Sequence, residues 1–172
     1  MSAFLDWLEV EARGFEVVSL IFKILIIDLI WTFFAMMVMV SFGSTFSFFQ
    51  LASIPIPDSM DWSFLVFLFS AAMIEEVIFR HVPLLIAVLM YGKSPRIIGV
   101  MVVSSIIFGL IHGGPLNLVF QGVGGFFLSI IFLKCGGFQM RPLKALFAST
   151  TAHFLYNLII FFIGMMARGM LS

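Results

Sequence analysis

The chain has 172 residues, of which 62% are hydrophobic, 16% aromatic and only 10% charged, and its mean hydropathy is +1.20. Soluble domains carry about 25% charged residues, so this composition excludes a water-soluble domain and a disordered tail. Nine basic and nine acidic residues give a formal net charge of zero, which leaves no basic surface for nucleic acid. The composition therefore predicts an integral multi-pass membrane protein.

Five apolar stretches approach the roughly 20 residues that a helix needs to cross a bilayer. In chain order they cover about residues 17–42, 62–90, 97–112, 116–133 and 145–167, of which the third is short. Alternating strand patterns are absent, so the sequence predicts an all-α fold, a polytopic helical bundle with about five transmembrane helices. Residues 1–16 are predicted to form an interfacial segment, and residues 17–172 a single membrane-embedded helical domain.

Among the connections between these stretches, alternate ones contain lysine and arginine. Two connections contain them, with Lys93 and Arg96 in one and Lys134, Arg141 and Lys144 in the other. The long connection over residues 43–61, which is predicted to dip partly back into the membrane, has none. Because cytosolic loops carry the excess of Lys and Arg, this alternation predicts a cytosolic N-terminus, a C-terminus on the far side, and insertion into the plasma or inner membrane.

Polar side chains inside apolar stretches are the most informative feature of the sequence, since each ionisable one costs roughly 2.5–3.5 kcal/mol at the bilayer centre. Asp28, in the first stretch, is predicted to bond to a neighbouring helix without a catalytic role. The others cluster in the second stretch or lie in the third and fifth, and they include every histidine of the chain: Glu75, Glu76, Arg80, His81, His112, His153 and Asn157.

Helical spacing sorts these residues, because side chains four positions apart share a face. The predicted neighbours are Glu76 with Arg80, Phe108 with His112, and His153 with Asn157. Depth can be counted from the basic connections at about 1.5 Å per residue. On that count Glu75, His112 and Asn157 lie at a similar depth of roughly 20 Å, with His153 somewhat shallower. An acid, an imidazole and an amide are therefore expected to meet in one polar hollow.

Three short motifs on separate apolar stretches carry a family resemblance. Glu75–Arg80 reads as EExxxR, Phe108–His112 as FxxxH and His153–Asn157 as HxxxN. Their order and placement resemble the CAAX prenyl endopeptidase and bacteriocin-processing family of intramembrane proteases. The resemblance covers Glu75 to Asn157, about half of the chain, inside a motif-bearing core over residues 62–167.

Peptide hydrolysis needs an activated water, a proton for the leaving amine and a stabilised oxyanion. Glu75, a carboxylate in an apolar site, is suited to act as the general base, with His112 positioning the same water, and the resemblance implies the same assignment. His153 and Asn157 offer N–H donors from one helix face, as an oxyanion site requires. These four residues are the predicted catalytic set.

The Glu76–Arg80 pair is expected to support this set by neutralising a buried charge and by orienting Glu75. A metal is the open question. Glu75, His112 and His153 would make a three-ligand zinc site with one open position, but the sequence has no HExxH motif. A glutamate mechanism needs no metal, so the sequence favours an enzyme without a required cofactor and keeps zinc as the alternative.

The resulting hypothesis is an intramembrane endopeptidase that cleaves membrane-associated peptides. Its expected partners are membrane lipids and a membrane-anchored, lipidated or leader peptide substrate, and the sequence leaves the oligomeric state open. Two other functions compete with this one. A proton- or ion-coupled transporter would also place Glu and His in the membrane, although no repeated halves are visible. The third is a non-enzymatic bacteriocin-immunity or scaffold protein.

Overall fold

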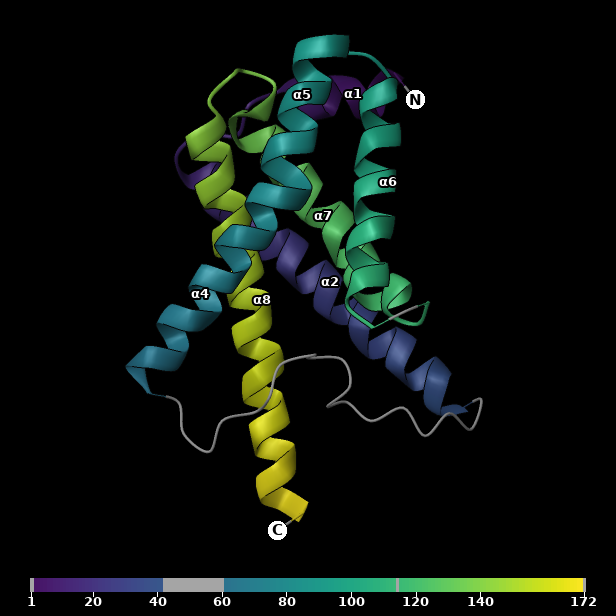
Figure 1. Cartoon of the computed structure of the whole chain (residues 1–172), viewed down its shortest axis with the longest axis vertical. Helices are drawn as coiled ribbons and strands as arrows, with labels where there is room; N and C mark the ends of the chain where they lie inside the picture. Colours follow the sequence, from purple (N-terminus) through teal and green to yellow (C-terminus); the bar gives the residue numbers. More distant parts are fainter. Residues whose placement is uncertain (1, 42–60, 114, 172) are drawn as a thin grey trace.

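The computed structural model describes residues 2–41, 61–113 and 115–171, and the regular secondary structure of these residues is helical (Figure 1). The all-α prediction is therefore confirmed. The α-helices are α1 (Ser2–Glu9), α2 (Phe15–Ser41), α4 (Trp62–Glu76), α5 (Val82–Tyr91), α6 (Arg96–Ile111), α7 (Val123–Phe132) and α8 (Pro142–Leu171). Three short π-helical segments, η1 (Val77–His81), η2 (Leu118–Gly122) and η3 (Leu133–Gly137), continue or precede them.

Four continuous helical stretches are long and apolar enough to cross a membrane, namely Phe15–Met39, Trp62–Tyr91, Leu118–Gly137 and Pro142–Met166. The remaining predicted crossing, the short one over residues 97–112, is α6, which has 16 residues and a length of about 24 Å, against a hydrocarbon core of about 30 Å. Helix α1 and the last turns of α8 lie at opposite ends of the bundle (Figure 1). An odd number of crossings, which the sequence predicts, places the beginning and the end of the chain on opposite sides of the membrane.

The second crossing changes its helical geometry next to its charged residues. Asp61 caps the start of α4 by accepting a hydrogen bond from the backbone N–H of Phe64 at 2.8 Å. After Glu76 the helix widens into η1 and then resumes as α5. Pro83 has no N–H to offer the carbonyl of Phe79 four residues earlier, and the hydroxyl of Ser104 on α6 donates to that carbonyl instead. The widened segment is thereby anchored to α6.

Helix α7 lies in the interior of the bundle and packs against α2, α6 and α8. The crossing that contains it, Leu118–Gly137, is the most buried of the four. Gly124 and Gly125 give it a flat surface on two sides, because a methyl group at either position would meet a side chain of another helix within 3.0 Å. Close packing on small residues is common in membrane bundles, and here it brings polar groups of α2 and η1 close to α7.

The fourth crossing extends further than the sequence predicts. Lys134 predicts a connection after residue 133, yet the helix continues into η3 as far as Cys135, and the chain kinks at Gly136, whose φ is 133°. The ammonium group of Lys134 is buried and donates to the backbone carbonyls of Trp7 and Val10 at 2.6 and 3.0 Å. These carbonyls, in and just after α1, supply the polar partners that the lysine would otherwise find in water.

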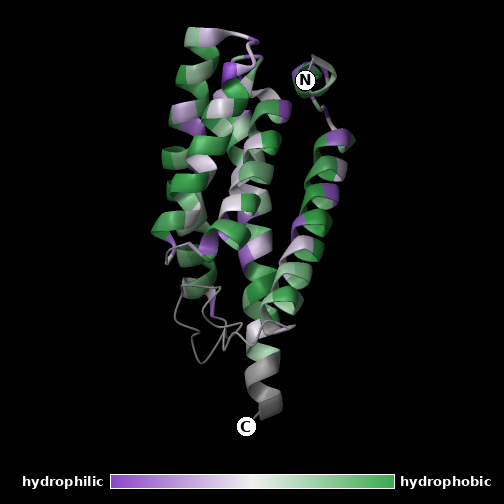
Figure 2. Ribbon diagram, turned by 90° about the vertical axis from the view of Figure 1, so that its right-hand side faces the viewer, coloured by the Kyte–Doolittle hydropathy of each residue, from purple (hydrophilic) through white to green (hydrophobic). Residues whose placement is uncertain are grey.

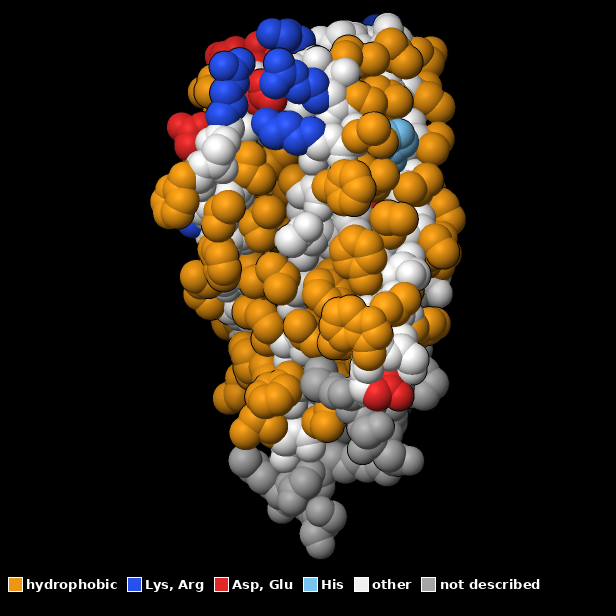
Figure 3. All heavy atoms as spheres, turned by 90° about the vertical axis from the view of Figure 1, so that its left-hand side faces the viewer, with side chains coloured by type: hydrophobic (Ala, Val, Ile, Leu, Met, Phe, Trp, Pro, Cys, Tyr) orange, Lys and Arg blue, Asp and Glu red, His pale blue; other side chains and the backbone are white. Residues whose placement is uncertain are grey.

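One end of the bundle gathers the basic side chains, and we call it the basic end. Helix α1 lies across it and is seen end-on in Figure 2. The carboxylate of Glu11 binds Arg13, Arg141 and Lys144 at 3.2, 3.2 and 2.7 Å. Below this end the surface is mainly hydrophobic (Figure 3), as expected where lipid is the solvent. The predicted dip of residues 43–61 falls, apart from Asp61, outside the described residues.

Candidate active site

The carboxylate of Glu75 lies between two imidazole rings that come from other helices. Its Oε1 is 3.7 Å from Nε2 of His112, and its Oε2 is 3.5 Å from Nε2 of His153. Glu75 is the second-last residue of α4, His112 follows the last residue of α6, and His153 lies within α8. The Glu75 side chain keeps 29% of its surface exposed, so a substrate or a water molecule can reach it. Three predicted catalytic residues thus share one site.

Hydrogen bonds on the far side of each ring determine which nitrogen carries the proton. Nδ1 of His112 is 2.7 Å from the carbonyl oxygen of Phe108, and Nδ1 of His153 is 3.0 Å from a carboxylate oxygen of Glu76. Both oxygens only accept, so both rings donate from Nδ1. In a neutral ring Nε2 then presents a lone pair, and both lone pairs face Glu75. The site is consequently suited to a group that donates protons between them, such as a water molecule.

The turn after α6 holds His112 in place. Gly113 has a φ of 126°, a left-handed conformation that L side chains rarely adopt. The amide of Asn117 donates to the backbone carbonyl of His112, and the backbone N–H of His112 donates to Gly109. His112 is therefore fixed through its ring, its carbonyl and its amide, which explains why a residue beside two glycines can be a precise part of a site.

Glu76 points away from Glu75 into a fully buried ion-pair network. Its Oε1 is 3.0 Å from the guanidinium of Arg80 and 3.0 Å from Nδ1 of His153. The side chains of Glu76 and Arg80 are at most 1% exposed. Buried ion pairs are costly to break, about 3–5 kcal/mol when one partner is removed. Through His153 this network reaches Glu75, so the two adjacent glutamates hold the same imidazole from its two nitrogens.

Phe108 is the apolar centre of the site. Its ring lies 4.3 Å from that of His112 and 5.8 Å from that of His153, measured between centroids. On another side the guanidinium carbon of Arg80 stands 4.0 Å from the ring centroid, within cation–π range. Phe108 is 1% exposed. The sequence places Phe108 beneath His112, but its contacts with Arg80 and His153 depend on how three helices pack.

Asn157 lies one turn after His153 on α8, as the spacing predicts, and its side chain is half-buried. Within the described parts of the chain its amide makes no hydrogen bond. His153 is different, since both of its nitrogens face carboxylates. The structure therefore binds His153 to the acids and leaves the Asn157 amide as a donor for another molecule.

Asp28 on α2 is a further polar residue of this region that the sequence-based site set omits. It is 6% exposed and lies within electrostatic range of Arg80. Together with Gln121, His153 and Tyr156 it lines a cavity of about 10 Å³, which is room for one water molecule. The sequence indicates a functional role for Asp28 only by placing an acid in the middle of an apolar stretch. Where the Asp28 side chain points depends on the packing of α2 against α7 and α8.

The described residues contain no group of three His, Cys, Asp or Glu side chains arranged to hold a metal ion. Nε2 of His112 and Nε2 of His153, the imidazole ligands of the zinc site that the sequence allows, face different oxygens of Glu75 at 3.7 and 3.5 Å.

Comparison with known proteins places the chain in a family. Residues 57–159, more than half of the chain, match the model of the Rce1-like family, described as type II CAAX prenyl endopeptidase Rce1-like. The match includes Glu75, His112 and His153 and excludes α1 and α2. Neither the curated proteins nor the solved structures gave a significant match. The chain is thus an integral membrane protein that belongs to the Rce1-like family of type II CAAX prenyl endopeptidases.

Proposed function

We propose that the chain hydrolyses a peptide bond of a membrane-associated peptide with a water molecule activated by Glu75. The observation that carries this proposal is the position of the Glu75 carboxylate between Nε2 of His112 and Nε2 of His153. Three proton acceptors that converge from separate helices bind and polarise a water molecule well. The family membership supports protease chemistry at this place in the chain.

In the proposed reaction Glu75 takes one proton of the water while the water oxygen attacks the carbonyl carbon of the peptide. Nε2 of His112 accepts a hydrogen bond from the second O–H of the water and so orients the attack. The tetrahedral intermediate then collapses as the C–N bond breaks. Glu75 returns its proton to the leaving amine, and the carboxylate is regenerated. The proton that Glu75 takes from the water in the first step is the one that it gives to the amine in the second.

The negative oxygen of the intermediate needs donors that are fixed before the reaction. The Asn157 amide supports this role because it makes no hydrogen bond among the described residues. We assign the donor role to Asn157 and give His153, whose Nε2 faces Glu75 as an acceptor, the role of holding the water. Glu76 and Arg80 act by holding His153 and need not touch the substrate.

The proposed substrate is a peptide anchored in the membrane, either by a lipid on its C-terminal segment or as a leader. The exposure of Glu75 and the apolar surface around it support a substrate that arrives within the bilayer. We place the chain in the plasma or inner membrane with the basic end in the cytosol, since cytosolic loops carry the basic residues.

No cofactor is required by this proposal. Cleavage by the purified chain is expected to persist in a strong chelator, because a carboxylate such as Glu75 can take a proton from water without a metal. Loss of cleavage with the chelator, followed by recovery on addition of zinc, would overturn this part of the proposal and leave the membrane protease assignment intact.

The main test is cleavage of a panel of prenylated, otherwise lipidated and unmodified peptides by purified chain in detergent. Glu75→Gln and His112→Ala are expected to lower kcat by at least about a hundredfold, as loss of a general base or its partner does. Glu16→Gln, a surface glutamate in α2, is the matched control and should retain activity. Full turnover by Glu75→Gln would remove Glu75 from the mechanism. A parent chain that folds yet cleaves none of the panel would favour the scaffold function.

A further inference from the structure

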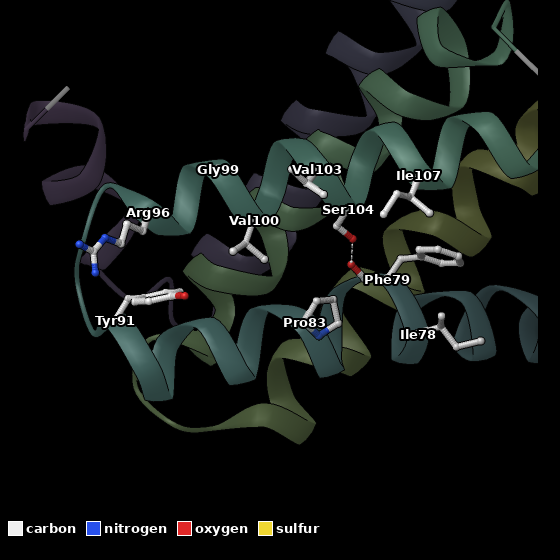
Figure 4. A pocket seen from close by; sticks show the side chains of 10 residues that line it. All are labelled: Ile78, Phe79, Pro83, Tyr91, Arg96, Gly99, Val100, Val103, Ser104 and Ile107. Atoms are coloured by element: carbon white, nitrogen blue, oxygen red, sulfur yellow. Dashed lines mark hydrogen bonds between the residues drawn. The ribbon is translucent and has the colours of Figure 1, made fainter.

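A groove separate from the Glu75 site runs between α6 and the η1–α5 part of the second crossing (Figure 4). Its volume is about 470 Å³. Ile78, Pro83, Val100, Val103 and Ile107 form most of its wall, and Tyr91 and Arg96 lie at the basic end. The groove is therefore apolar along its length and charged at one end only.

The inner part of the groove offers no free polar group to an occupant. The hydroxyl of Ser104 points into the wall and donates to the carbonyl of Phe79, as the dashed line in Figure 4 shows. The remaining side chains there are hydrocarbon. Any molecule that fills this part is expected to be hydrocarbon as well, since a polar group would lose its hydrogen bonds to water without replacement.

The outer end of the groove carries an available positive charge. Arg96 is exposed and makes no ion pair within the described residues, and its guanidinium carbon lies 5.5 Å from the ring centroid of Tyr91. Other cations at the basic end are engaged: Lys93 binds Glu9, while Arg141 and Lys144 bind Glu11. Arg96 is thus placed to bind an anionic group at the membrane surface.

The length of the groove matches one leaflet. From Arg96 to Ile107 the helix rises by 11 residues, or about 16 Å at 1.5 Å per residue, and half of the hydrocarbon core is about 15 Å. A phospholipid has this layout, with a phosphate at the surface and an acyl chain that reaches the midplane. A free phosphate would fill only the end, and a neutral hydrocarbon would leave Arg96 without a partner.

We propose that this groove is a binding site for an anionic phospholipid, whose acyl chain lies against α6 and whose phosphate binds Arg96. At its inner end the lipid chain reaches Phe79, whose ring lies 5.2 Å from that of Phe108 beneath the site. The bound lipid therefore supports the wall behind His112. This inference goes beyond the proposed hydrolysis and does not depend on it, because lipid binding can be measured without a substrate.

Gly99 provides a substitution that fills the groove without disturbing the fold. It lines the groove on α6, and a Cβ placed there meets no atom within 4 Å. Gly99→Phe should occupy the space of the acyl chain, whereas Gly99→Ala is the matched control and leaves most of the space open. In native mass spectrometry of the full chain from nanodiscs, Gly99→Phe should retain about a fifth as much phospholipid as Gly99→Ala, the factor equivalent to about 1.0 kcal/mol. Equal retention would overturn the proposal.

The charge is tested in nanodiscs of equal parts dioleoylphosphatidylglycerol and dioleoylphosphatidylcholine. The parent is expected to retain the anionic lipid about fivefold over the neutral one, as one basic residue near the surface provides. Arg96→Gln should reduce this ratio to about one while Arg96→Lys keeps it. Lys93→Gln, in the same connection but paired with Glu9, should leave it unchanged. A preference that survives Arg96→Gln, or displacement of the lipid by a prenylated peptide, would contradict a resident phospholipid.

Discussion

The guanidinium carbon of Arg80 lies 4.0 Å from the ring centroid of Phe108, so the first and second motifs are in direct contact. Arg80 is at most 1% exposed and is bound on its other side by Glu76. The aromatic face compensates part of the cost of burying a cation. Because the same ring also contacts His112 and His153, a change at Phe108 should affect the whole site.

Replacing Phe108 with leucine is expected to lower both stability and activity. The change removes the cation–π contact and opens space in the core, which should cost about 1–3 kcal/mol of unfolding free energy. Thermal unfolding in detergent and kcat/KM on the best peptide of the panel measure the two effects. Phe120→Leu is the matched control, because Phe120 is also 1% exposed but packs with Ala35 in another cluster. It should lose stability while its folded fraction keeps kcat/KM. Equal activity losses in the two variants would contradict a specific role for Phe108.

Replacing Arg80 with alanine is expected to destabilise the chain by about 3–5 kcal/mol, since it leaves Glu76 buried without its cation. The exposed Lys93–Glu9 pair offers a control with the same kind of charge removal, and Lys93→Ala should cost less than about 1 kcal/mol. Chemical unfolding in detergent measures both. An Arg80→Ala chain as stable as its parent would show that the buried pair does not hold the fold.

Gly125→Ala should damage the site because the added methyl group would press on Arg80 and Phe108. A Cβ at this position would lie 2.6 Å from an Arg80 guanidinium nitrogen and 3.1 Å from the Phe108 ring. Since both groups are locked by their partners, we expect overpacking to cost about 1–3 kcal/mol. Gly99→Ala meets no atom within 4 Å and should be neutral or stabilising by up to about 1 kcal/mol. Thermal midpoints of the two variants compare them directly, and equal midpoints would argue against tight packing at Gly125.

The basic end should lose stability in acid because of Glu11. The hydrogen bond from Lys144, helped by the charge of Arg141 and the hydrogen bond from Arg13, holds the pKa of Glu11 below its ordinary value, although burial acts in the opposite direction. A carboxyl with a lowered pKa in the folded chain stabilises it fully above the ordinary pKa near 4.3. This contribution is lost as pH falls through the lowered pKa of the folded state.

The thermal midpoint measured from pH 7 to pH 3 tests this effect. As the pH falls, the thermal midpoint of the parent should decrease by more degrees than that of Glu11→Gln. This difference should appear below about pH 4.3. Glu16→Gln, an exposed glutamate of the same region, serves as the control and should follow the parent. Identical pH profiles for the parent and Glu11→Gln would show that the cluster does not contribute.

Depth in the membrane could be predicted from the sequence because it depends only on the helical rise and on where each apolar stretch begins. This is why Glu75, His112 and Asn157, on three stretches, could be expected at one level, with His153 somewhat shallower. Spacing of four residues likewise indicated the Glu76–Arg80 ion pair, which the structure contains at 3.0 Å. Composition and the absence of alternating strand patterns determined the helical class, since a chain of this hydropathy must satisfy its backbone hydrogen bonds internally and helices do so within one segment.

The rotation of each helix about its axis was decided only by the tertiary structure. Glu75 and Glu76 are adjacent, yet one faces both Nε2 atoms and the other is buried against Arg80 and Nδ1 of His153. The contacts of Phe108 with Arg80 and the approach of Asp28 to α7 have the same origin. Rotation depends on how closely neighbouring helices approach, and here the small residues of α7 allow that approach. Such packing joins residues far apart in the chain, so no local pattern of side chains encodes it.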